Sequence, residues 1–240
     1  MTTRTRTRTI ALVAAGAIVI LVAIGYLLLG VFGGSVPAEV ALSSVSAGVT
    51  ASGDPGEAAG TWVVDAASGS LADGTSSFAG YRIEEQLSGV GAHEAVGRTQ
   101  SVTGTMTVSD TQVTTLDVTV EMTTLQSDDD RRDAQLRQRG LETDSFPTAT
   151  FTLTEPIEVG KTPKVGATVD ATAVGQLTLH GVTQQVSVPV QARWTGERIE
   201  VAGSLDVALA DHQIEPPVGF LVLSIADHGT IEFHLLFTRA

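Results

Sequence analysis

The chain of 240 residues contains no cysteine, so neither a disulfide framework nor a lipidated N-terminal cysteine is available to it. A folded domain must therefore be held together by its core. Aromatic residues make up only 5% of the sequence, so large rings fill little of any interior. Basic residues are also scarce, with 14 Lys and Arg against 27 Asp and Glu. That balance argues against nucleic acid and against an anionic lipid surface as partners.

The only long uncharged run lies near the N-terminus. Residues 1–9 contain three arginines, and the 23 residues of 10–32 contain no charge. At about 1.5 Å per residue this run is long enough to cross a hydrocarbon core of roughly 30 Å. We therefore expect a single transmembrane helix at 10–32. The arginines predict that residues 1–9 are cytoplasmic and that the C-terminal part lies outside the cell membrane.

A cleaved signal peptide is the alternative interpretation of this segment, because small residues surround Val36-Pro37-Ala38. The uncharged run exceeds the roughly 7 to 15 residues of a signal-peptide apolar region, which favours an uncleaved signal-anchor.

Residues 33–60 are rich in Gly, Ser, Ala, Val and Pro and show no sustained apolar period, which predicts a flexible linker. The folded domain is expected at 61–240. Without the three N-terminal arginines, 11 Lys and Arg face 27 Asp and Glu, a net charge of −16 that is typical of a soluble acidic domain.

Within 61–240 the dominant pattern is alternation of apolar and polar residues, which predicts strands with one apolar face. Turn signals such as His180-Gly181 and Thr195-Gly196-Glu197 separate the segments. Eight or nine antiparallel strands result, and either a closed barrel or a two-sheet sandwich could use them. Several strands of ten or more residues are easier to place in a tilted barrel. The alternating segments lie near 62–64, 76–83, 102–108, 116–123, 149–153, 175–179, 186–194, 199–209 and 231–237.

One short helix is predicted in mid-chain, at 127–140. Ser127 and Asp130 have the spacing of a capping box, and the acids at 128–130 suit the positive end of the helix dipole. Arg137 and Arg139 suit its negative end, and Gly140 is a suitable stop. Because it is a single helix in an all-β domain, we expect it to close or brace one end of a barrel, tied there by Arg131, Arg132 and Asp133.

Four motifs occur in order along the domain: Gly60-Thr61-Trp62-Val63-Val64-Asp65, Arg132-Asp133-Ala134-Gln135-Leu136-Arg137, Phe146-Pro147-Thr148-Ala149-Thr150-Phe151, and Gly175-Gln176-Leu177-Thr178-Leu179-His180-Gly181-Val182-Thr183. In this order and spacing the chain resembles the YceI-like family over about 61–239. The resemblance implies an all-β, eight-stranded antiparallel lipocalin-like barrel with one short helix, which holds a polyisoprenoid lipid.

The composition agrees with a lipid cavity. Walls of Val, Leu, Ala and Gly leave an eight-stranded barrel underfilled, and an isoprenoid tail would gain about 0.8 kcal/mol for each buried CH₂ equivalent. The predicted function is a membrane-anchored extracytoplasmic protein that holds an isoprenoid lipid, of quinone or polyprenyl type, for sequestration or transport. The alternative is a cell-envelope interaction or structural protein with a filled core. The residues predicted to line the cavity are Phe78, Met106, Val118, Leu136, Phe146, Phe151, Leu177, Trp194, Leu205, Phe220 and Phe233.

No pattern indicates catalysis. The five histidines fall in separate segments without metal-ligand spacing, and no Gly-x-Ser-x-Gly elbow is present. We therefore expect no enzyme, no metal and no cofactor, while a homodimer stays open.

Overall fold

The computed structural model describes residues 36–42, 58–160 and 164–240. The predicted transmembrane segment 10–32 and most of the predicted linker lie outside these residues. Within the described ranges, no helix is both long and apolar enough to cross a bilayer. Pro37–Ala240 form one compact unit.

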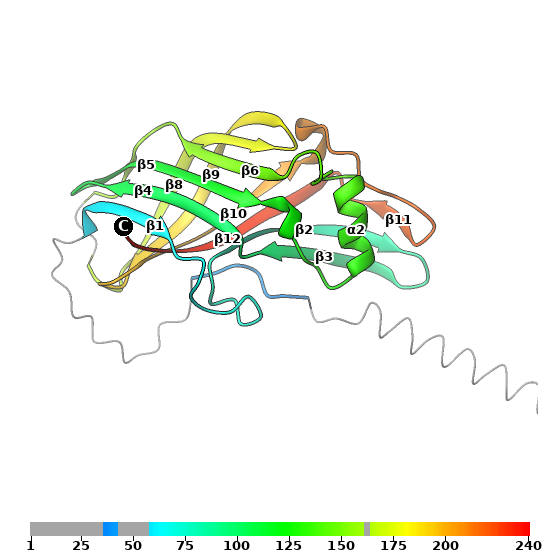
Figure 1. Ribbon diagram of the computed structural model, residues 1–240, viewed down its shortest axis with the longest axis horizontal. Helices are drawn as coiled ribbons and strands as arrows, with labels where there is room; N and C mark the ends of the chain where they lie inside the picture. The colour runs from blue at the N-terminus through cyan, green and yellow to red at the C-terminus, as the bar shows by residue number, and fades with distance from the viewer. Residues whose placement is uncertain (1–35, 43–57, 161–163) are drawn as a thin grey trace, which may run out of the picture. The chain divides into compact units, whose positions relative to one another are not determined.

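The described residues form a single antiparallel sheet of twelve strands (Figure 1). Eight of them are paired in the order β1-β4-β5-β6-β8-β9-β10-β12, and β12 pairs back onto β1 to close the ring. This confirms the predicted eight-stranded barrel and excludes the two-sheet sandwich. The strands are β1 (Gly60–Val64), β2 (Phe78–Leu87), β3 (Gly91–Thr99), β4 (Val102–Val108), β5 (Gln112–Glu121), β6 (Thr148–Leu153), β7 (Ile157–Glu158), β8 (Thr168–Leu179), β9 (Val182–Trp194), β10 (Ile199–Ala208), β11 (Val222–Ile225) and β12 (His228–Arg239).

Strand β12 is long enough to pair with two different strands, β1 and β2, along one of its edges. Its C-terminal half pairs with β1, and its N-terminal half pairs with the first part of β2. β11 pairs with the last part of β2 on the same side as β12, and β3 pairs with β2 on the opposite side. At this end the wall is completed by the bridge between Arg98 and Gln126, which joins β3 to the segment after β5. The barrel is therefore extended at one end by β2 and β3.

Three strands were not predicted: β3, β7 and β11. β3 lacks an apolar period because one of its faces carries only the small Ala95 and Gly97 near its middle, while the other carries the charged Glu94 and Arg98. Both charged side chains form ion pairs within the fold. Contacts with other strands therefore hold β3 in the sheet, although it lacks the alternation of apolar and polar residues that a half-buried strand normally shows. β7 and β11 have two and four residues, too few to show a period.

The predicted helix is present as α2 (Asp130–Gln138), with short 3-10 turns at η2 (Met122–Thr124) and η3 (Leu209–His212). Its predicted N-terminus was wrong by two residues. The N-cap is Asp129, whose carboxylate accepts from the Arg131 N–H, whereas Ser127 lies before the helix and donates to Asp133 at 2.7 Å. The predicted stop is confirmed, since Gly140 has a φ of 74° directly after the C-cap.

Candidate functional site: an apolar cavity inside the barrel

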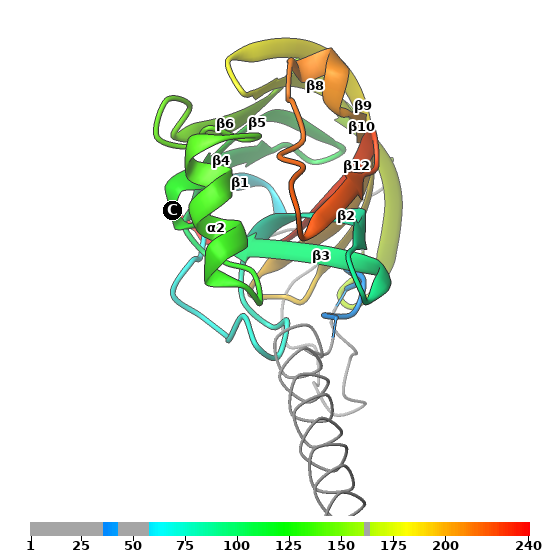
Figure 2. The same cartoon turned by 90° about the vertical axis from the view of Figure 1, so that its right-hand side faces the viewer.

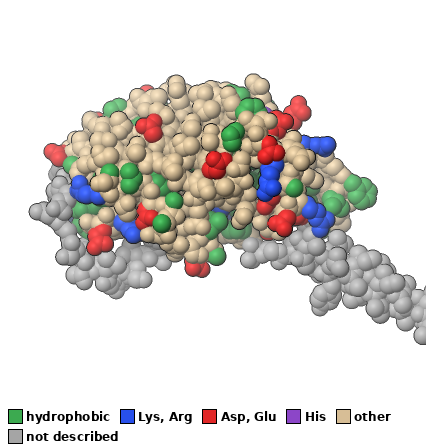
Figure 3. Space-filling model, viewed as in Figure 1, with side chains coloured by type: hydrophobic (Ala, Val, Ile, Leu, Met, Phe, Trp, Pro, Cys, Tyr) green, Lys and Arg blue, Asp and Glu red, His purple; other side chains and the backbone are tan. Residues whose placement is uncertain are grey.

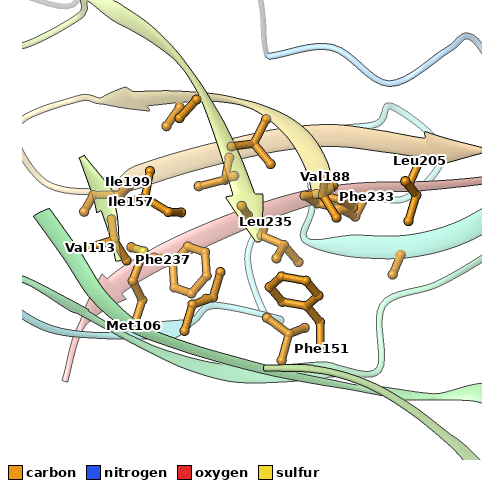
Figure 4. A pocket seen from close by; sticks show the side chains of 18 of the residues that line it. Met106, Val113, Phe151, Ile157, Val188, Ile199, Leu205, Phe233, Leu235 and Phe237 are labelled. Carbon is orange, nitrogen blue, oxygen red and sulfur yellow. The ribbon is translucent and has the colours of Figure 1, made fainter. Parts of the chain in front are cut away.

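The barrel encloses a cavity of about 270 Å³. Its walls come mainly from inward residues of β4, β5, β6, β8, β9, β10 and β12, with contributions from β2 and β7, and these side chains point toward one another across the lumen (Figure 4). Three apolar clusters form these walls and leave space between them. Ligand pockets commonly have volumes of roughly 300 to 1,000 Å³, so this space is at the small end and suits one slender apolar group.

Most of the residues predicted to line a cavity do so. These are Met106, Val118, Phe151, Leu177, Trp194, Leu205 and Phe233. Each lies at an inward position of a strand whose alternation was visible in the sequence, because side chains of a strand point alternately to its two faces.

The structure places the other four predicted residues elsewhere. Phe78 is buried on the outer face of β2, under the Arg98 guanidinium at 4.5 Å from its ring centroid. Phe146 packs against the ring of His180, and Leu136 of α2 lies beside Gly140. Phe220 is 90% exposed. The apolar character of these residues indicated burial, but only the three-dimensional structure shows whether such a side chain faces the lumen.

Glycines on neighbouring strands let two aromatic rings lie flat against the wall. A Cβ atom at Gly203 would lie 2.6 Å from Cζ of Phe233, and one at Gly175 would lie 2.5 Å from Cζ of Phe151. Any larger residue at these glycines would push the rings toward the centre of the barrel. The two glycines therefore help to keep the lumen open.

Two of the residues that line this space have a buried polar atom without a protein partner among the described residues. The hydroxyl of Tyr81 and the indole N–H of Trp194 are enclosed, and neither has a hydrogen-bond partner among the described residues. Tyr81 pairs with Ile231 of β12. Trp194 pairs with Ile199 of β10, which in turn pairs with Phe237 of β12. Ile231 and Phe237 are six residues apart, about 20 Å along a strand. One donor therefore lies toward each end of the cavity.

Burial raises the pKa of Tyr81 well above its usual value. The nearby Arg132 opposes this rise, and the acids Asp133, Glu85 and Asp128 add to it. The hydroxyl therefore stays protonated and is available to donate to an acceptor oxygen of a ligand.

Beyond Tyr81 the inner face of β2 becomes polar where α2 covers it (Figure 2). Arg132 of α2 donates to Glu85 of β2 at 2.6 Å and to Asp128 at 2.5 Å. Asp133 accepts from Ser127, while Arg131 remains largely exposed. The predicted role of Arg132 in tying the helix to the end of the barrel is confirmed, and Figure 2 shows α2 as a brace beside β3.

The outer face of the same strands carries buried charges. Glu232 of β12 pairs with Arg98 at 2.6 Å and with Arg82 at 3.3 Å, and Arg82 also pairs with Glu94. Both guanidinium groups donate to the carbonyl of Ala38, and Arg82 donates in addition to that of Pro37. Part of the segment predicted as linker therefore lies against the barrel wall.

A second buried network lies further along β12. His234 bonds to Glu200 of β10 and to the carbonyl of Ser76, each at 2.8 Å, and Glu200 pairs with Arg193 of β9. Burial alone disfavours the charged imidazole, but these two acceptors outweigh it and raise the pKa of His234 above its usual value. Sequence reasoning did not identify either network, since their members are far apart in the chain.

Within the described residues, no group of three or more His, Asp or Glu side chains is arranged to hold a metal ion. His228 and His234 share one face of β12, as their spacing predicted, yet His228 pairs only with the exposed Asp227.

The fold and the cavity define an antiparallel barrel with an apolar interior. Residues 62–237 match the YceI-like domain family, and the chain belongs to that family. Among solved structures, it is similar to a polyisoprenoid-binding domain from Saccharophagus degradans implicated in plant cell wall breakdown. That match has 18% identity and a TM-score of 0.55, covering 75% of this chain and 98% of that one. It is also similar to BcnA of Burkholderia cenocepacia, with 18% identity and a TM-score of 0.53, covering 72% of this chain and 98% of that one. No curated protein matches the chain.

Proposed function

We propose that this protein holds an isoprenoid lipid in its barrel, at the outer side of the cell membrane to which its N-terminal segment anchors it. The observation that carries the proposal is the cavity. It is an almost wholly apolar space in a barrel of eight strands, and a barrel of this size can otherwise be filled by its own side chains. A solved domain of the same fold is described as polyisoprenoid-binding, which supports this class of ligand.

The chemistry of the walls fits a long hydrocarbon better than a polar ligand. Every branched or aromatic wall residue gains from contact with an apolar tail, and each CH₂ group moved from water into the lumen contributes about 0.8 kcal/mol. The polar head of such a lipid would place a carbonyl or hydroxyl oxygen near one of the two enclosed donors, Tyr81 or Trp194. A quinone or a polyprenyl alcohol has such an oxygen.

The alternative, a structural barrel with a filled core, predicts a solid interior. The cavity favours the carrier, which would sequester or transport its lipid without a covalent step. Anchoring rests on the 23 uncharged residues of 10–32 and on the three arginines before them. The mass of the mature protein, measured after extraction from membranes, separates an uncleaved anchor from a removed signal peptide.

Organic extraction of the full-length protein, followed by mass spectrometry, tests the carrier. We expect an isoprenoid lipid at a fixed ratio to protein. The variant Ala173→Trp, which fills the lumen from β8, should lose the lipid. The variant Thr172→Trp, at the neighbouring exposed position, should retain the lipid. Lipid that is absent from the wild type and that fails to bind when added as a pure isoprenoid would contradict the proposal.

A further inference from the structure

Large hydrophobic side chains are exposed at one end of the barrel. Among the described residues, six such side chains are exposed, and five of them lie in the β2–β3 turn or in and just before β11. We call these five the apolar tip: Val90, Val218, Phe220, Leu221 and Leu223. Phe220, which the sequence predicted inside the cavity, is the most exposed of them at 90%.

The apolar tip is held in place by backbone hydrogen bonds. The Ser88 N–H donates to the Leu221 carbonyl at 2.8 Å, and the Gly219 N–H donates to the Val222 carbonyl at 2.9 Å. Val222 also pairs with Leu87 across β11 and β2. These bonds fix the backbone while the side chains remain in solvent, so the exposure is built into the fold.

The tip projects at the end of the molecule where α2 lies, and Figure 3 shows its hydrophobic side chains at the right-hand end. Residues 216–223, Pro-Pro-Val-Gly-Phe-Leu-Val-Leu, contain no charged side chain and none that donates or accepts a hydrogen bond. Such a segment offers a protein partner little specificity, because orientation at a protein interface depends on placed polar groups.

A segment of the chain links the tip to the wall of the cavity. The segment from η3 to β11, which leads into the tip, crosses this end of the barrel in Figure 2. Its Ile214 packs into the wall cluster with Leu177 and Leu179, both of which line the cavity. The tip therefore lies a few residues along the chain from a side chain that packs against the cavity wall.

Cationic side chains stand beside the tip. A Cβ atom at Gly140 would lie 3.1 Å from Pro217, so the C-terminal end of α2 adjoins the tip, and its Arg137 and Arg139 are exposed. Asp144 and Glu215 are exposed in the same region, so these charges largely balance. The arginines suit lipid phosphates, but apolar insertion supplies the main attraction.

We propose that the apolar tip inserts into the interfacial region of a lipid bilayer, so that the α2 end of the barrel faces the membrane. A second copy of the chain is a poorer occupant, because a stable interface buries on the order of 800 Å² on each partner and five side chains offer far less. A bilayer needs no complementary shape. The 35 residues before Val36 contain the predicted anchor, which keeps the domain next to such a surface.

The absence of native cysteine allows a single reporter to be attached to the full-length chain. An environment-sensitive fluorophore at Leu223→Cys reports on the tip, and the same fluorophore at Thr111→Cys reports on the exposed β4–β5 turn at the other end of the barrel. Both proteins are reconstituted into phosphatidylcholine vesicles free of isoprenoid. Quenching is then measured with spin-labelled lipid and with aqueous iodide.

We expect lipid quenching and protection from iodide at position 223, and the reverse at position 111. Adding Phe220→Ser and Leu221→Ser to the Leu223→Cys protein should make it behave like the control, with an unchanged melting temperature. Equal iodide quenching at both positions would overturn the proposal. So would protection at 223 that disappears on dilution of protein in the membrane, because that result indicates a second copy. Since no cargo is present, failure of the lipid-carrier proposal leaves this outcome unaffected.

Discussion

Around β12 the two faces of the sheet bury opposite chemistry. Phe233, Leu235 and Phe237 point inward to the cavity, whereas Glu232 and His234 point outward into ion-pair networks. A buried charge without a partner is expensive, so the outer face must be filled and paired. An apolar wall has no such requirement. Along β12 the inner side can therefore leave open space, whereas the outer side must supply a partner for each buried charge.

The largest expected effect comes from breaking the outer face. Replacing Glu232 with Ala leaves Arg82 and Arg98 without their shared buried carboxylate, which should cost about 3–5 kcal/mol of unfolding free energy. Urea denaturation checks this. The matched control is Glu84→Ala, at an exposed outer position of β2, which should change stability by less than about 0.5 kcal/mol. Equal losses in the two variants would show that the ion pairs are not what closes this face.

A larger side chain on the inner face of the barrel should reduce lipid binding more than it reduces the free energy of unfolding. Gly203→Val crowds both the ring of Phe233, which must move into the lumen, and the backbone carbonyl of Pro189, so the cost is at least about 1–3 kcal/mol from overpacking. The variant should stay folded but lose its extractable lipid. Ser204→Val, on the exposed side of the same strand, should keep it. Retention of lipid by the Gly203 variant would mean that the ligand does not occupy this part of the cavity.

The Tyr81 hydroxyl and the Trp194 indole N–H are the two buried donors without a partner on the otherwise apolar cavity wall. Tyr81→Phe should weaken binding of an isoprenoid with a carbonyl or hydroxyl head by about 1 kcal/mol, roughly fivefold, while leaving a pure hydrocarbon unaffected. Stability should change little, because the hydroxyl has no partner among the described residues. Titration with the two ligands measures this. If Trp194→Phe shows the selective loss instead, the head lies at the opposite end.

The smallest effect concerns pH and the outer face. Both ring nitrogens of His234 meet acceptors, so the fold favours the imidazolium and raises its pKa. This contribution to stability is complete below the ordinary histidine pKa of about 6.5 and is lost as pH rises through the higher pKa of the folded state. Melting temperature should therefore fall over that range in the wild type.

The variant His234→Gln should flatten that decline, since it cannot take up a proton. His228→Gln is the matched control on the same strand face, where the imidazole is exposed to solvent. A wild-type melting temperature that is constant across this pH range would contradict the assignment.

Sequence alone was sufficient for the strands whose apolar period is regular, and seven of the predicted lining residues followed from it. It failed where tertiary pairing replaces periodicity. β3 places Arg98 at a buried position and Glu94 at a half-buried one, because both find partners on other strands. Phe78 and Phe220 resembled cavity residues because a large apolar side chain indicates burial in general, without specifying which face of the sheet it occupies.

The sequence by itself determined the alternation of the strands, the turn at His180-Gly181, the short helix and the family, because each depends on residues close together in the chain. Only the tertiary structure decided how the barrel closes and how its faces are used. It paired β12 with both β1 and β2, brought Glu232 to Arg82 and Arg98, folded two phenylalanine rings over distant glycines, and left an apolar tip in solvent. These contacts join residues far apart in sequence, and no local pattern encodes which of them will meet.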